Sequence, residues 1–326
     1  KNSLHPFQER VRRKVMNLIS NKQKRFLIHM PTGSGKTRTA AEIVLDFIRQ
    51  SASKSLLPRN LKILWVAQSQ ELCEQAAGTL KWMIDNKGTS DIEIGHFYGS
   101  NEIDNDIVNH PAIIFCGISK LMLNYMKPIW SDIKRDNYLV IVDEAHRSVA
   151  SEWVKALDFF TEHSSVYLLG LTATPGLGSG PDGTNLLAQY YDNNKIKLLD
   201  DDYTDIDNPI SYLRKRKFLA NIEPHTIEST IELSTQDLNQ KNKDSFDFDA
   251  KTLEKLSLSP SRNLSIVNII KKHHKLKEKI LVFTCGVEHN KILKQVLKNN
   301  DIYSEAVDKD SKNRNELIEK FKDKDS

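Results

Sequence analysis

Short apolar runs alternate along the chain with longer segments in which apolar residues recur about every 3.6 positions. Nearly continuous apolar runs predict buried parallel strands, because such strands are covered on both faces. We expect strands at 26–30, 61–66, 92–97, 112–116, 138–142, 166–171 and 280–283. The helical spacing predicts helices between them, for example at 37–50, 69–84 and 152–160. Strands that alternate with helices indicate an α/β fold on a doubly wound parallel sheet.

The alternation weakens after about residue 200, and this predicts how the chain is divided. Residues 200–208 are acidic and turn-rich, and residues 236–249 are polar with alternating charge. We expect a first α/β domain over 1–200, a connector over 201–260 with a short helix near 209–217, and the start of a second α/β domain over 261–326. In that last part we expect helices from Ser261 and Val287. One or two strands cannot complete a sheet, so the second domain is expected to be truncated.

Composition argues against a membrane protein, a secreted protein and a zinc-binding or disulfide-bonded protein. The longest apolar runs are far too short to cross a bilayer, and residues 1–6 lack the apolar core of a signal peptide, so we expect a cytoplasmic protein without a membrane partner. Cys73, Cys116 and Cys285 lie far apart and form no CxxC pair, which predicts neither disulfides nor a zinc site. Lys and Arg number 47 against 43 Asp and Glu, a net charge of +4 that permits nucleic-acid binding without arguing for it.

A glycine-rich loop is the first candidate for chemistry. Residues 30–37, MPTGSGKT, follow a predicted strand and open a predicted helix. Two glycines let successive N–H groups converge on phosphate oxygens, and the helix N-terminus adds its dipole. We expect ATP and Mg²⁺ as ligands: Thr32, Gly33, Ser34 and Gly35 would cradle the phosphates, Lys36 would hold the β- and γ-phosphates, and the Thr37 hydroxyl would bind Mg²⁺. The strict P-loop pattern has glycine where Met30 stands, and a turn that only caps a helix is the alternative.

A second candidate is the pair of acids that follows the apolar run 139–142. Asp143 is expected to hold Mg²⁺ through the water shell of the metal, and Glu144 to orient and polarise the attacking water. His146 is expected to lie near the γ-phosphate and to relay its state. An acid pair after a strand is also common where a helix starts, but the glycine-rich loop earlier in the chain favours the catalytic interpretation.

Two threonines end the next predicted strand, in the sequence GLTATP at 170–175. The hydroxyls of Thr172 and Thr174 could bond to the acid pair on one side and to a second domain on the other, which would couple the two. A threonine turn closed by Pro175 is the alternative.

These three motifs, in this order, resemble motifs I, II and III of the superfamily 2 DExH/DEAH-type helicases, in particular ResIII-like members related to restriction-enzyme motor subunits and DNA-repair helicases. The resemblance implies RecA-like domains. Gln8, in LHPFQ at 4–8, matches the glutamine that binds the adenine edge in this family. Looser matches are motif Ia at 66–72, motif Ib at 117–121 and motif IV at 279–284. Residues 209–220 (PISYLRKRKFLA) resemble the segment after motif III in bacterial members.

The resemblance implies an ATP-dependent helicase or translocase that hydrolyses ATP while it moves on nucleic acid, with DNA favoured over RNA. Ser69 and Ser119, each expected just before a helix, would bind backbone phosphates, and Lys120 would add charge. For each serine a simple N-cap is the alternative. Motifs V and VI are not found in this sequence. Because motif VI supplies the arginine finger of the family, this chain alone is expected to hydrolyse ATP weakly.

Two further functions stay open from the sequence. The chain could be an ATP-gated switch subunit of a larger complex, for example in defence or restriction, without strand separation. It could also be a motor that works beside a nuclease or another effector domain or subunit. No PD…ExK-type nuclease signature occurs in these residues.

Overall fold

The structure is a computed structural model that describes residues 3–53, 61–87, 92–163, 165–174, 181–199, 208–227, 249–308, 311 and 313–323. It divides into two compact units, Lys1–Asn221 and Ile222–Ser326. Pro175 and most of the two polar stretches, 200–207 and 236–248, lie outside the described residues.

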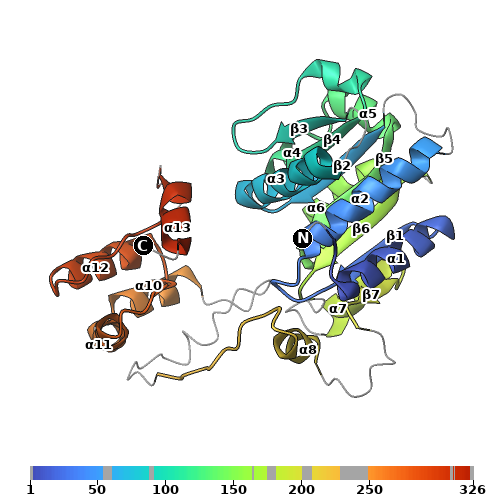
Figure 1. Ribbon diagram of the computed structural model, residues 1–326. Coiled ribbons are helices and arrows are strands. Elements are labelled where there is room, and N and C mark those ends of the chain that lie inside the picture. The colour runs from blue at the N-terminus through green and yellow to red at the C-terminus, as the bar shows by residue number, and fades with distance from the viewer. Residues whose placement is uncertain are drawn as a thin grey trace. The chain divides into compact units, whose positions relative to one another are not determined.

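The first unit is built on one parallel sheet. Its strands are β1 (Arg25–His29), β2 (Lys62–Ala67), β3 (Glu93–Phe97), β4 (Ala112–Gly117), β5 (Asn137–Asp143), β6 (Tyr167–Thr172) and β7 (Lys195–Lys197). Their order across the sheet is β3-β4-β2-β5-β6-β1-β7, and every neighbouring pair is parallel (Figure 1). The predicted α/β fold is therefore confirmed. The strand β7 was not predicted, because it is three residues long and only Ile196 is buried.

Helices cover both faces of this sheet (Figure 1). One face carries α1 (Pro6–Ser20), α2 (Lys36–Ser53), α3 (Gln70–Lys87) and α8 (Pro209–Lys215). The other carries α4 (Ile118–Asn124), α5 (Pro128–Arg135), α6 (Ser151–Thr161) and α7 (Pro181–Tyr190). In α6 the buried residues Trp153, Ala156, Leu157 and Phe160 follow the 3.6-residue period that predicted the helix. No helix in the described ranges has the length and apolarity to cross a membrane.

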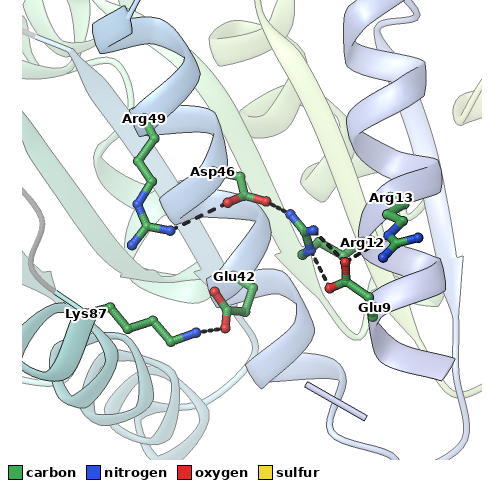
Figure 2. A network of polar contacts seen from close by, with 7 residues as sticks. All are labelled: Glu9, Arg12, Arg13, Glu42, Asp46, Arg49 and Lys87. Carbon is green, nitrogen blue, oxygen red and sulfur yellow. Dashed lines mark hydrogen bonds and ion pairs between the residues drawn. The ribbon is translucent and has the colours of Figure 1, made fainter. Parts of the chain in front are cut away.

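An ion network joins the three helices α1, α2 and α3 (Figure 2). From α1, Arg12 contacts Glu9 at 2.6 Å and also bonds to Asp46 of α2. From α3, Lys87 is paired with the buried Glu42 of α2. These ion pairs are only partly open to solvent, so they fix α1 against α2 more firmly than exposed pairs would. The network therefore sets the position of the two helices whose N-terminal ends carry Gln8 and Lys36.

The second unit is helical in its described part. It contains α10 (Ala250–Leu258), α11 (Pro260–Lys275), α12 (Val287–Lys298) and α13 (Arg314–Lys322). Its small core consists of Val267, Ile270, Leu293, Leu297 and Ile302. The helices predicted from Ser261 and Val287 are confirmed.

The strand predicted at 280–283 is wrong. A strand needs a neighbour that completes its hydrogen bonds, and no strand is found among the described residues of this unit. Ile280 packs against the small core, whereas Leu281 is 66% and Phe283 89% exposed. The apolar run 280–283 predicts a buried strand, but only its first residue is covered. The assignment of this unit to an incomplete second RecA-like domain stays a prediction.

Candidate nucleotide site

The carboxyl ends of β1, β6 and β5 lie side by side at one edge of the sheet. In the sheet register Thr172 of β6 is opposite His29 of β1, and Leu171 is opposite Asp143 of β5. The N–H of Met30 donates to the carbonyl of Thr172 at 3.0 Å. The glycine-rich loop that follows β1 and the acids that end β5 are thus separated by one strand. This is the edge at which parallel α/β sheets bind ligands.

The loop after β1 has the curled backbone that phosphate binding requires. Gly33 and Gly35 adopt left-handed conformations, with φ of +78° and +83°. The N–H of Ser34 donates to the carbonyl of Pro31 at 3.2 Å, and its buried hydroxyl donates to the same oxygen at 2.6 Å. Helix α2 then begins at Lys36. A concave run of backbone N–H groups at a helix N-terminus is a ready site for an anion.

Gln8 braces this loop from α1. Its side chain is buried, and Nε2 donates to the carbonyl oxygens of Ser34 and Gly35 at 2.9 and 3.5 Å. Its Oε1 accepts from the N–H of His5 at 2.9 Å. A Cβ on Gly35 would lie 2.3 Å from Nε2, so only glycine allows this approach. The predicted contact of Gln8 with adenine stays a prediction, for which Oε1 retains a second lone pair.

Lys36 and the two acids, Asp143 and Glu144, influence one another through their charges. Lys36 is half-buried and has no ion pair among the described residues. Burial lowers the pKa of its ammonium group, and the carboxylates of Glu144 and Asp143 act in the opposite direction. Burial raises the pKa of Asp143, because its charged form is desolvated, while Lys36 lowers it. Because Lys36 forms no ion pair in the described part of the chain, its ammonium group can bind an anion while the two carboxylates bind a metal.

The oxygen atoms at this edge fit Mg²⁺, which prefers carboxylate and hydroxyl ligands and keeps several waters. The Asp143 carboxylate is buried, and its one hydrogen bond within the described residues is from the N–H of Glu144, at 3.0 Å. Thr37 lies in the first turn of α2, and no hydrogen bond engages its hydroxyl in that described part of the chain. Both groups therefore retain free lone pairs.

Glu144 has a strained backbone that aims its side chain. Its φ and ψ are +52° and +47°, a left-handed conformation that is uncommon for a residue with a side chain and is concentrated at functional sites. The turn leads into the short helix η2 (Ala145–Arg147), and His146 Nδ1 lies 3.3 Å from Glu144 Oε2. The hydrogen bond from His146 lowers the pKa of Glu144 more than burial raises it. Because a carboxylate only accepts, Nδ1 carries the proton in this contact.

The two threonines after β6 meet the same histidine. His146 Nδ1 is 3.4 Å from Thr172 Oγ1 and 3.5 Å from Thr174 Oγ1. The Thr172 hydroxyl is buried, donates to the carbonyl of Thr174 at 3.0 Å and accepts from its N–H at 3.1 Å. The structure thus links these threonines to the acid pair through His146. Their predicted coupling to a second domain stays a prediction.

The residues predicted to bind nucleic acid differ in their surroundings. Ser69 accepts from the N–H of Leu72 at 3.4 Å, as an N-cap of α3 does. Ser119 was expected just before a helix, and this is wrong: α4 begins at Ile118 with Gly117 as its cap, because β4 passes directly into the helix. Ser119 is exposed in the first turn. Residues Ala67 and Gly117 pair across β2 and β4, so both helix starts lie at the same edge of the sheet.

The ammonium group of Lys120 already has several partners in the loop after β3. It contacts Glu102 Oε1 at 2.7 Å and donates to the carbonyl oxygens of Asn101 and Gly99 at 2.5 and 3.3 Å. The side chain also lies over the ring of Phe97, with Nζ 4.6 Å from its centroid. A contact with a nucleic-acid phosphate would have to compete with these partners.

One contact at the glycine-rich loop was not predicted. Cδ2 of Leu219 lies so near Gly33 that a Cβ on this glycine would be 2.8 Å away. The signal in the sequence is the apolar pair Phe218-Leu219 directly after a basic run, within the segment 209–220 that carries part of the family resemblance.

Comparison with known proteins agrees with these features. A family model described as "Type III restriction enzyme, res subunit" (ResIII) matches residues 1–177. IRC3 of Saccharomyces cerevisiae, which is named as an ATP-dependent helicase, is 25% identical over 327 aligned residues that cover 98% of this chain and 42% of IRC3. The ATP-dependent DNA helicase MPH1 of the same species is 27% identical over 195 residues, 59% of this chain and 18% of MPH1.

A solved structure, the UvsW helicase from bacteriophage T4, is 16% identical, with 60% of each chain covered and a TM-score of 0.42. The chain spans less than half of the length of IRC3. The family model matches more than half of this chain, and its matched residues 1–177 contain the glycine-rich loop, the acid pair and both threonines. The chain therefore belongs to the ResIII family of superfamily 2 helicase-type proteins.

Proposed function

We propose that this chain is the ATP-binding part of a motor that hydrolyses ATP to move on nucleic acid. The observation that carries this proposal is that a loop curled to receive phosphate, followed by Lys36, lies at the same edge of the sheet as Asp143 and Glu144, one strand away. Membership of the ResIII family and the full names of IRC3 and MPH1, which both contain the word helicase, support it. They give no support to the alternative of an ATP-gated switch without strand separation.

The chemistry follows from the charges at this edge. The loop N–H groups and Lys36 bind the β- and γ-phosphates and stabilise the charge that moves onto their oxygens during transfer. Glu144, kept ionised by His146, holds and polarises the attacking water, and phosphoryl transfer demands orientation more than strong basicity. Bound Mg²⁺, held by Asp143 and Thr37, would neutralise phosphate charge.

Substitution of Lys36 tests the proposal. Lys36→Ala removes the cation at the phosphate loop, so the affinity for ATP should fall by at least about tenfold, a loss typical for a charged hydrogen bond. Equilibrium titration with ATP and Mg²⁺ measures this. Lys155→Ala is the matched control, because Lys155 is exposed on α6 and pairs only with Glu152 among the described residues. Equal ATP affinity in parent and Lys36→Ala would refute the assignment.

The finer parts of the proposal concern substrate and partners. DNA is favoured over RNA because MPH1 is named as a DNA helicase and the family description refers to a restriction enzyme. ATPase rates with duplex DNA and with duplex RNA of one sequence would distinguish the two, and a larger stimulation by RNA would overturn the preference.

Ser69 and Ser119 are proposed to bind backbone phosphates, with Lys120 adding charge. Thr172 and Thr174 are proposed to transmit the nucleotide state to a second domain. A nuclease or other effector is proposed as a partner.

Turnover by this chain alone is proposed to be slow. We propose that the motif that supplies an arginine finger in this family is not among these 326 residues, and such a finger raises the rate of phosphoryl transfer by orders of magnitude. A steady-state ATPase assay with saturating DNA checks this, and turnover near about 10 s⁻¹, the median for enzymes, would contradict it.

A further inference from the structure

The segment after α8 turns back towards the glycine-rich loop. Lys217 is left-handed, with φ of +58°. The N–H of Phe218 donates to the carbonyl of Leu213 at 2.8 Å, and the N–H of Lys217 to that of Arg214 at 2.8 Å. This pair of bonds is the Schellman motif that ends many helices, here with lysine in the place where glycine is usual. The turn directs the next two residues back along α8.

The turn is anchored in the core of the first unit. Tyr212 and Leu213 of α8 are buried in the same core cluster as residues of α1 and α2. Phe218 and Leu219 pack against that cluster but are only half-buried. Their position is therefore fixed by packing, while part of their apolar surface stays accessible.

Both residues contact elements of the nucleotide site. The ring centroid of Phe218 lies 4.4 Å from that of His5 and 5.2 Å from that of Phe7. Phe7 directly precedes Gln8, which braces the phosphate loop, and His5 lies three residues before Gln8. Leu219 lies against Gly33 of the loop itself, close enough that any side chain at that position would collide with it. A single turn thus touches the segment before Gln8 and the loop.

A purine needs an apolar or aromatic surface on which to stack, in addition to polar groups at its edge. The Gln8 amide already bonds to Ser34 and His5, so it offers little surface. The half-buried ring of Phe218 offers a π face beside the exposed His5. We propose that Phe218 stacks on the base of the bound nucleotide and that Leu219 supports the loop at Gly33. This inference rests on the proposed ATP binding.

The base contact can be separated from the phosphate contact with two ligands. ATP carries a base, whereas inorganic tripolyphosphate offers the phosphates alone. Phe218→Leu keeps apolar volume against His5 and Phe7 but removes the ring. Its affinity for ATP should fall about fivefold or more, the loss expected for one stacked base, while its affinity for tripolyphosphate should stay that of the parent. Phe218→Trp, which retains a ring, should bind ATP like the parent.

Phe283→Ala is the matched control, because it removes a ring that is 89% exposed in the second unit. It should bind both ligands like the parent. The inference is overturned if the parent binds ATP and Phe218→Leu binds it equally well, or loses affinity for ATP and tripolyphosphate to the same degree. Should the parent itself bind neither ligand, the proposed ATP binding fails instead. Melting curves of each variant show that it is folded.

Discussion

At the scale of single residues, backbone conformation decides what the side chains can do. Glu144 adopts φ of +52°, which costs roughly 1–3 kcal/mol for a residue with a side chain. The turn places Glu144 Oε2 3.3 Å from His146 Nδ1, and the carboxylate also raises the pKa of Lys36 through its charge. At Gly35 the left-handed backbone is instead combined with the absence of a side chain, since a Cβ there would collide with Gln8.

Glu144→Gln should separate binding from turnover. The amide has almost the same size, so ATP affinity should stay within about twofold of the parent. It cannot polarise water as a carboxylate does, so turnover should drop by about 10²-fold or more. Single-turnover ATPase measurements and ATP titration together test this. A variant that hydrolyses ATP at the parental rate would show that Glu144 does not act on the water.

The place of the candidate site residues in the fold could be predicted from the sequence, but their side-chain contacts could not. The loop and the acid pair were recognised because each follows a strongly apolar run at the end of a strand, and the topology of a parallel sheet then brings such ends together. The commitment of Lys120 to Glu102 and to two carbonyl oxygens was not foreseeable, because it depends on a loop that is distant in sequence. The same holds for Leu219 against Gly33.

At the scale of elements, the ion network of Figure 2 holds α1 on α2. The hydrogen bond from Arg12 is the main cause that lowers the pKa of Glu9 from 4.5 to about 2. A carboxyl group with a depressed pKa in the folded state stabilises the fold above its unfolded pKa. This stabilisation is lost as the pH falls from about 4.5 towards 2. Because α1 carries Gln8, the network also supports the phosphate loop.

Glu9→Gln should therefore lower the denaturation midpoint at pH 7, and the difference from the parent should shrink as the pH falls below 4.5. Urea denaturation at pH 7, 5 and 3 measures this. Glu152→Gln is the control, because Glu152 is exposed and pairs only with the exposed Lys155 in the described part of the chain, so it should have little effect at any pH. An identical deficit for Glu9→Gln at all three pH values would contradict the role of its charge.

Secondary structure was predictable where burial was nearly complete. Strand β4 is apolar throughout and β2 is apolar after its first residue, Lys62, and both are fully or almost fully buried, so their sequences allow little else. The prediction of strands failed in two opposite ways after residue 190: one strand was missed, and one was predicted where none forms among the described residues. Strand β7 has alternating lysines and too little apolar surface to be noticed. Residues 280–283 have the apolar surface but, within the described second unit, no neighbouring strand to pair with. Hydrophobicity reports burial, whereas a strand also requires a partner.

At the scale of the whole molecule, the two units have separate cores of unequal size. The core of the first unit combines helices on both faces of a sheet, whereas five residues form the core of the second in its described part. All residues proposed to bind ATP lie in Lys1–Asn221. A small core contributes little stability. A substitution in the core of the second unit should therefore unfold that unit and leave the first unit folded.

Leu293→Ala tests whether the two cores are independent. Leu293 is buried in the second core, so its truncation should cost that unit about 2–4 kcal/mol. Hydrogen exchange should accelerate in α11 and α12 and stay unchanged in β5 and β6, and ATP affinity should remain that of the parent, since no ATP contact is removed. Leu297→Met, which conserves volume in the same core, should leave exchange nearly unaffected. Faster exchange in β5 on Leu293→Ala would mean that the two units unfold as one, and the site would then depend on both cores.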